Sequence, residues 1–118
     1  MQVKLQHVAH VRSGDKGNTS NISVIAYDGV FYAILKEQLT AERFKAFYGR
    51  AITGDVERYC IDGLAAMNFV AHGALGGGVS RSLSLDNYGK ALSAAILGFE
   101  LDVPEWLRSS LRGYGATA

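Results

Sequence analysis

The sequence predicts an α+β protein, a two-layer sandwich in which helices cover one face of a mostly antiparallel sheet. The first observation is the order of the predicted elements, which runs strand, strand, helix pair, strand, strand, helix. Strand runs mixed with helices in this way are typical of α+β folds. The second is length, because 118 residues suffice for one domain with a single core. The third is composition, which at 48% hydrophobic and 19% charged residues is that of an ordinary globular protein.

The first two predicted strands lie on either side of a polar segment. Residues 3–11 alternate between two faces, and residues 22–27 are rich in β-branched side chains. Residues 12–21 contain no apolar side chain, and their two glycines, Gly14 and Gly17, let the backbone approach a partner closely. We expect this segment to be a loop held by the strands, and loops on rigid scaffolds often carry binding groups.

Two helices are predicted next, each with its own cap. Asp28 is placed to cap a helix over residues 30–39, and Thr40 is placed to cap a second helix. Gly49 is well placed to end the second helix. The apolar stripe of that helix consists of Phe44, Phe47 and Tyr48. An aromatic stripe at this spacing predicts core packing.

A hairpin is predicted in the second half of the chain. Residues 55–61 and 66–72 have strand character, and the turn signal Asp62-Gly63 lies between them. Cys60 lies within the first of these strands, on the same face as Val56, and has no nearby thiol or imidazole partner in sequence. We therefore expect a buried, unmodified thiol packed in the sheet.

The last third of the chain begins with a second glycine-rich segment. Residues 73–82 contain three consecutive glycines, which suggests close backbone packing or approach of a ligand. Asp86 is expected to cap a third helix that runs to about Leu97. Pro104 then opens a short amphipathic turn before a tail of small residues.

Charge and composition exclude several classes of function. The net charge of +1 gives no electrostatic reason to bind nucleic acid or an anionic membrane surface. One cysteine cannot form an internal disulfide, which is compatible with a reducing cytoplasm. The first residues alternate and lack the apolar core of a signal peptide. No apolar run approaches the ~20 residues of a membrane span. We expect a cytoplasmic protein.

Metal and nucleotide motifs are missing as well. His7 and His10 differ by three positions, so in a strand they point to opposite faces, and His72 stands alone. No zinc or calcium spacing occurs. In Gly14-Asp15-Lys16-Gly17 the lysine precedes the second glycine, unlike a phosphate-binding P-loop. The sequence therefore predicts neither a metal nor a cofactor.

An anion site is compatible with the residues. Cationic side chains flank glycine-rich backbone whose amides could form a concave nest for carboxylate or phosphate. The expected ligand-binding residues are Arg12, Gly14, Lys16, Gly17, Gly76, Gly77, Gly78 and Arg81. The alternative is that Arg12 and Arg81 pair with Asp15 or Asp86 and only hold the two loops together. Asn68, in a predicted strand, needs partners if it is buried, and we expect it to brace one of these loops.

Several motifs resemble a known family. His10, then Arg12-Ser13-Gly14-Asp15-Lys16-Gly17, then Thr19-Ser20-Asn21-Ile22, is similar to the opening motif of the AtuA-like ferredoxin-fold domain. Later motifs match too: Glu37-Gln38-Leu39-Thr40, Asn68-Phe69-Val70, Gly73 through Val79, Arg81-Ser82-Leu83 and Gly89-Lys90. The resemblance implies a ferredoxin-like fold over residues 1–103, followed by a short amphipathic turn and tail over 104–118.

The resemblance also implies a biological setting. In that family the domain commonly forms the C-terminal part of acyclic terpene utilisation proteins, behind a larger domain that this chain lacks. This implies a small separate subunit of an AtuA-type system, linked to catabolism of acyclic terpenoid or branched acyl compounds. Its expected partner is a larger AtuA-type subunit or a second copy of itself, and its polar loops would contribute to a shared site.

Two other classes of function stay open from the sequence alone. The chain could be a free-standing enzyme acting on an anionic small molecule, with His10 or Asp15 as acid or base and Lys16 and Arg81 as anchors. It could also be a structural oligomerisation module. Catalysis by the isolated chain would favour the first, and a homo-oligomer indifferent to changes in the polar loop would favour the second.

Overall fold

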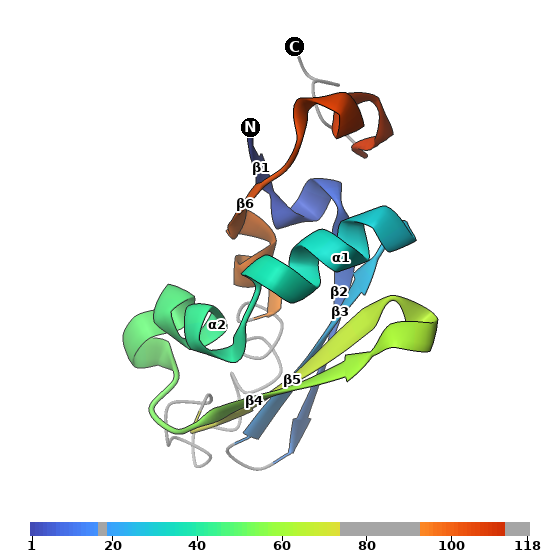
Figure 1. The fold of residues 1–118 in the computed structure, drawn as a ribbon. Helices are drawn as coiled ribbons and strands as arrows, with labels where there is room; N and C mark the ends of the chain where they lie inside the picture. Colours follow the sequence, from blue (N-terminus) through green and yellow to red (C-terminus); the bar gives the residue numbers. More distant parts are fainter. Residues whose placement is uncertain (17–18, 74–92, 113–118) are drawn as a thin grey trace.

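The computed structural model describes residues 1–16, 19–73 and 93–112. Over these residues the main sheet has four antiparallel strands, and the helices α1 (Gly29–Gln38) and α2 (Ala41–Tyr48) pack against it (Figure 1). The strands in spatial order are β2 (Ala9–Lys16), β3 (Thr19–Ala26), β5 (Ala66–His72) and β4 (Val56–Ile61). The predicted α+β class is confirmed.

The order of the strands gives the sheet its ferredoxin-like character. Both β3 and β4 run antiparallel to β5, so they are parallel to each other with β5 between them. The helices α1 and α2 connect β3 to β4, which makes a split βαβ unit. The remaining position, beside β3, belongs to β2, which precedes β3 in the chain and pairs with it as a hairpin.

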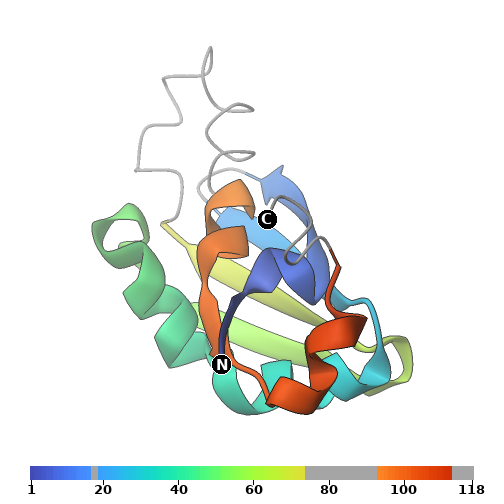
Figure 2. The same cartoon turned by 90° about the horizontal axis from the view of Figure 1, so that it is seen from above.

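The predicted strand over residues 3–11 is wrong in one respect, because it is two strands. The first, β1 (Gln2–Lys4), is followed by a 3₁₀ turn over Leu5–His7, and β2 begins only at Ala9. Val8 and Ala9 are both buried, whereas neighbouring side chains of a continuous strand point to opposite faces and would reach one core only in alternation. The turn lets consecutive residues reach one core. It also lets β1 pair with β6 (Glu100–Asp102), and the two lie side by side in Figure 2.

Both predicted helix caps are confirmed. Asp28 accepts a hydrogen bond of 3.0 Å from the backbone N–H of Val30, and Thr40 accepts one of 3.1 Å from that of Arg43. Gly49 ends α2 with a φ of +56°, a value that favours glycine. Each helix therefore begins at a residue whose side chain satisfies a terminal backbone N–H.

The core lies between the helices and one face of the sheet. Phe44 of α2 is fully buried and stacks on Phe69 of β5, with 4.2 Å between ring centroids. Phe47, one turn further along α2, is 41% exposed. The other members of this core from α1 and the main sheet include Phe31, Leu35, Ile22, Val24 and Met67.

The predicted hairpin of β4 and β5 is present, with a 3₁₀ turn over Asp62–Leu64. The turn is held to α1, because the Tyr32 hydroxyl donates to Asp62 at 2.5 Å and the Lys36 ammonium lies 3.1 Å from the same carboxylate oxygen. The bond from Tyr32 and then the Lys36 charge hold the pKa of Asp62 below its usual value. Burial, and then the bond to Asp62, raises the pKa of Tyr32.

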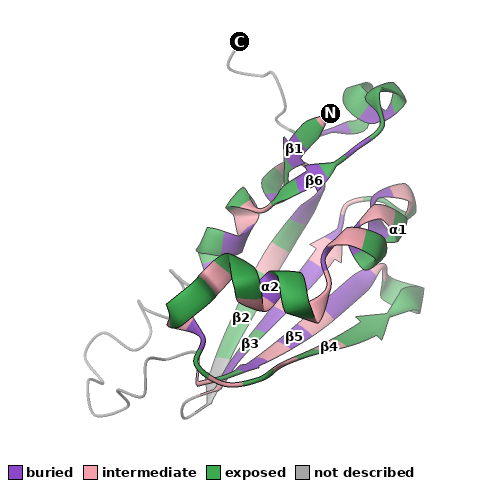
Figure 3. Ribbon diagram, turned by 60° about the vertical axis from the view of Figure 1, so that its left-hand side comes forward, coloured by how far each residue is buried: buried purple, intermediate pink, exposed green. Residues whose placement is uncertain are grey.

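The expectation that Cys60 is buried is wrong. Its thiol is exposed, although its register partner Met67 is fully buried. The physical reason is the place of β4 at the edge of the sheet, where most of the strand is exposed (Figure 3). A side chain of an edge strand can thus point to the same side of the sheet as the helices and still be exposed to solvent, because the helices do not extend over it.

The C-terminal turn packs on the start of the chain. Pro104 precedes a 3₁₀ segment, Glu105–Ser110, in which Leu107 is buried. The backbone N–H of Arg112 donates to the carbonyl of His7 at 2.9 Å. Ser93 to Ala95 are helical and lead into a 3₁₀ turn, Ile96–Gly98, at the end of the predicted third helix. The start of that helix at Asp86 lies outside the described residues, as do the tail after residue 112 and all of the second glycine-rich segment except Gly73.

Candidate functional site

The face of the main sheet turned away from α1 and α2 carries most of the polar side chains of the strands. Because paired residues in neighbouring strands share a face, the register identifies its members. We call this surface the open sheet face. Its described residues include His10, Arg12, Gly14, Thr19, Asn21, Ser23, Ile25, Ala66, Asn68, Val70, His72, Glu57, Tyr59 and Ile61.

A hydrogen-bonded amide lies at the centre of the open sheet face. The side-chain nitrogen of Asn68 donates to the Ser23 hydroxyl at 2.9 Å and to the side-chain oxygen of Asn21. Asn68 is half-buried, and the two bonds satisfy the two N–H groups of its side-chain amide. Asn68 thus does contact the polar segment over residues 12–21. However, the bond links the neighbouring strands β5 and β3 and does not brace a loop, since Asn21 lies within β3.

Arg12 lies beside this network. It pairs with Ser23 across β2 and β3, and Ser23 in turn pairs with Asn68, so the three residues form one row across the sheet. Arg12 is exposed and makes no hydrogen bond or ion pair with any residue of the described ranges. The alternative pairing with Asp86 falls outside the described residues, as does the side chain of Asp15.

The prediction of a loop over residues 12–21 is wrong for most of its length. Arg12 to Lys16 belong to β2 and Thr19 to Asn21 belong to β3, and the two stretches pair residue by residue. Pairing with β3 and β5 overrides the polar composition, because the polar side chains line a solvent-facing side of the sheet. Of the expected ligand-binding residues, Arg12, Gly14 and Lys16 are placed in β2. Gly17, Gly76, Gly77, Gly78 and Arg81 lie outside the described residues.

The ends of the two glycine-containing segments meet at one end of the sheet. Thr19 at the start of β3 pairs with His72 at the end of β5, so Gly73 follows directly beside the β2–β3 hairpin. Gly73 has a φ of +69°, and an added Cβ would lie 2.3 Å from the Thr53 hydroxyl. Ser20 is fully buried at this end, and its hydroxyl has no hydrogen-bond partner among the described residues.

The comparison with protein families decides the assignment. The model of the AtuA ferredoxin-like domain matches residues 3–102. The chain belongs to this family. No curated protein and no solved structure matches the chain. The family resemblance of the sequence motifs is confirmed over residues 3–102.

The titratable groups on the open sheet face of this AtuA ferredoxin-like domain are dispersed. His72 lies 3.2 Å from a carboxylate oxygen of Glu57, and both side chains are about half exposed. His10 stacks on Tyr27 with 5.6 Å between ring centroids. Within the described ranges, no three His, Cys, Asp or Glu residues gather closely enough to hold a metal ion. In the same ranges no helix is long and apolar enough to cross a membrane.

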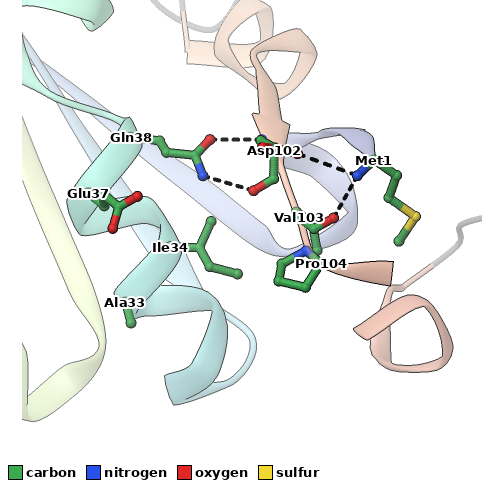
Figure 4. Close-up of a pocket in the computed structure, with 8 residues that line it drawn as sticks. All are labelled: Met1, Ala33, Ile34, Glu37, Gln38, Asp102, Val103 and Pro104. Carbon is green, nitrogen blue, oxygen red and sulfur yellow. Dashed lines mark hydrogen bonds and ion pairs between the residues drawn. The ribbon is translucent and has the colours of Figure 1, made fainter. Parts of the chain in front are cut away.

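A pocket of about 420 Å³ lies on another part of the domain, between α1 and β6 (Figure 4). Gln38 at its rim bonds both backbone groups of Asp102, donating to the carbonyl at 2.8 Å and accepting from the N–H at 2.7 Å. The chain's amino group donates to the carbonyl of Val103 at 2.8 Å. The lining residues are Met1, Ala33, Ile34, Glu37, Gln38, Asp102, Val103 and Pro104.

Sequence reasoning missed the row of side chains that the register brings together. Ser23, Asn68 and Tyr59 come from three strands, and only their pairing places them beside Arg12. The sequence does contain a signal for this row. Side chains at alternate positions of a strand share a face, and the polar residues at alternate positions of residues 19–25 and 66–72 indicate a face that is not packed on a core.

Proposed function

We propose that this AtuA ferredoxin-like domain is a small cytoplasmic subunit of an AtuA-type system. It works with a larger AtuA-type partner in the catabolism of acyclic terpenoid or branched acyl compounds and contributes polar residues to a site that the two chains share. The family match supports the relation to AtuA proteins. The setting and the partner rest on the resemblance of the motifs.

The observation that carries the proposal is the meeting of the two glycine-containing segments. Thr19 of the first segment, residues 12–21, pairs with His72, so it lies beside Gly73, where the second segment begins. Both segments hold cations in their sequences, Lys16 in the first and Arg81 in the second. A site built from both would suit an anionic ligand.

The open sheet face supports the need for a larger partner. Tyr59 and Ile61 are 52% and 43% exposed on β4, and both belong to this face. Exposed tyrosine beside apolar side chains is typical of surfaces that bind another protein. A partner that covers this face would also exclude water from the row that contains Arg12.

The free-standing enzyme has less support. His10 is exposed on the open sheet face, and its described neighbours give it no hydrogen bond that would orient the imidazole as an acid or base. Asp15 pairs with Ser20, a residue of the helix-covered face, whereas His10 pairs with Ile25 of the open face.

Isolation of the protein from its own cells under native conditions tests the proposal. We expect a larger AtuA-type chain to co-purify with it, with a native mass equal to the sum of the two chains. Tyr59→Asp should release the larger chain. Leu64→Asp is the matched control, because Leu64 is 69% exposed but lies in the β4–β5 turn, away from the open sheet face. Isolation of the chain alone at every concentration, or equal release by both variants, would contradict the proposal.

A further inference from the structure

We propose that the open sheet face binds a carboxylate with an apolar tail, and that the carboxylate lies over Gly14 between Arg12, Asn21 and Ser23. This deepens the proposed function by naming a ligand class and its residues, and it rests on that function only for the partner that covers the face.

The space arises from a glycine within a block of cross-strand pairs. Arg12 pairs with Ser23, and Gly14 pairs with Asn21 in the next row of the same face. Neighbouring strands are about 4.8 Å apart, so the four residues form a compact square. A Cβ added to Gly14 would meet no atom within 4 Å. The square therefore has side chains at three corners and an empty place at the fourth.

The hydrogen bonds of Asn68 set the polarity of that square. Asn68 donates to the side-chain oxygen of Asn21 and to the Ser23 hydroxyl oxygen, and this uses acceptors of both residues. Asn21 and Ser23 also carry donors that Asn68 does not use, namely the amide N–H groups of Asn21 and the O–H of Ser23. These donors suit a bound group that accepts hydrogen bonds.

Charge narrows the ligand to an anion. Arg12 presents a guanidinium that makes no ion pair or hydrogen bond with the described residues, and its planar N–H groups match the geometry of a carboxylate. The anion on the open sheet face, Glu57, lies on β4, two strands away from β3, and is close to His72. Nothing described at the square competes with a bound anion for the guanidinium.

The surroundings of the square are apolar on two sides. Val70 pairs with Asn21 on β5, and Ile25 follows Ser23 on the same face of β3. Both are half-buried, and the exposed rings and chains of Tyr59 and Ile61 continue the apolar surface on β4. A carboxylate held over Gly14 can thus extend an apolar chain across the sheet, which favours an amphipathic acid over a small inorganic anion.

Nuclear magnetic resonance titration of the isolated chain tests this, with octanoate as the probe. We expect octanoate to shift the side-chain amide signals of Asn21 and the Nε–H signal of Arg12. It should bind at least tenfold more tightly than acetate, which lacks the tail, or octylammonium, which has the opposite charge. Equal affinity for octanoate and octylammonium would contradict the proposal that the site binds a carboxylate. Equal affinity for octanoate and acetate would contradict the proposal that the ligand has an apolar tail.

Three variants make the test specific. Gly14→Val should abolish binding and leave the melting temperature unchanged or higher, because a β-branched residue suits a strand and the space is empty. Asn68→Asp should also abolish binding, since a carboxylate at that position accepts from Asn21 and Ser23 and reverses the polarity of the square. Arg12→Met should weaken binding about tenfold or more.

Arg50→Met is the matched control for Arg12→Met, because Arg50 is also exposed but lies after α2, away from the sheet face. Octanoate binding that Gly14→Val leaves intact, or that both arginine variants weaken equally, would overturn the inference. The isolated chain is used throughout, so failure here leaves the co-purification of the larger partner as a separate result. Loss of the partner likewise leaves the titration unaffected.

Discussion

Two phenylalanines of α2 provide a direct test of how the helix packs on the sheet. Phe44 is fully buried and stacks on Phe69 at 4.2 Å with an interplanar angle of 6°, whereas Phe47 is 41% exposed. Replacing a fully buried phenylalanine with alanine costs about 3–5 kcal/mol, which includes the cavity left behind. Replacing Phe47 should cost only about 1 kcal/mol, because much of the ring is already in water.

These free energies correspond to measurable shifts in the melting temperature. The entropy of unfolding scales to about 0.25 kcal/mol/K for a chain of this length, so 1 kcal/mol shifts the midpoint by about 4 °C. We expect Phe44→Ala to lower the midpoint by about 12–20 °C and Phe47→Ala by about 4 °C, measured by differential scanning calorimetry. Equal shifts for the two variants, or a larger one for Phe47→Ala, would refute this packing of α2.

Three further predictions follow from backbone space, burial and exposure. Gly54→Ala should lower the urea midpoint of unfolding, because the added Cβ would lie 2.6 Å from a backbone oxygen. Gly63→Ala should leave the midpoint nearly unchanged, because the added Cβ would meet nothing within 4 Å. Equal effects of the two variants would contradict this reasoning. Burial raises the pKa of both Tyr32 and Tyr48, so the stability they contribute is present below about pH 10, where unfolded tyrosine titrates, and is lost as pH rises further. Urea unfolding at pH 9 and pH 11 should show this loss, Tyr48→Phe should reduce it, and a midpoint independent of pH would argue against it. Cys60 is exposed and should react with a thiol reagent in the folded protein, so protection until unfolding would contradict its position at the sheet edge.

Local signals in the sequence predicted the elements that depend on local chemistry. The caps at Asp28 and Thr40 need only a side-chain oxygen and a nearby backbone N–H, and both bonds are present. The β4–β5 hairpin likewise follows from Asp62-Gly63 between two strand-like stretches. These features could be derived because every group involved is close in sequence.

Features that depend on distant partners could not be derived in the same way. The polar residues from Arg12 to Lys16 have low strand character alone and form β2 because β3 offers a paired ladder. Likewise, β6 is too short to show a pattern and exists through its pairing with β1. The open sheet face was predicted to exist, but the alignment of Arg12, Ser23 and Asn68 depends on a register that one residue of slip would destroy.

The two hydrogen bonds of Gln38 have a consequence for how the protein behaves at high concentration. In the small sheet of β1 and β6, the N–H and C=O of Asp102 point away from β1, toward the side where another strand could add. Gln38 occupies both groups with one side chain, so this edge is blocked at Asp102 without a further strand. Unpaired strand edges promote association between chains. A single glutamine on α1 thus hinders the association of chains through β6.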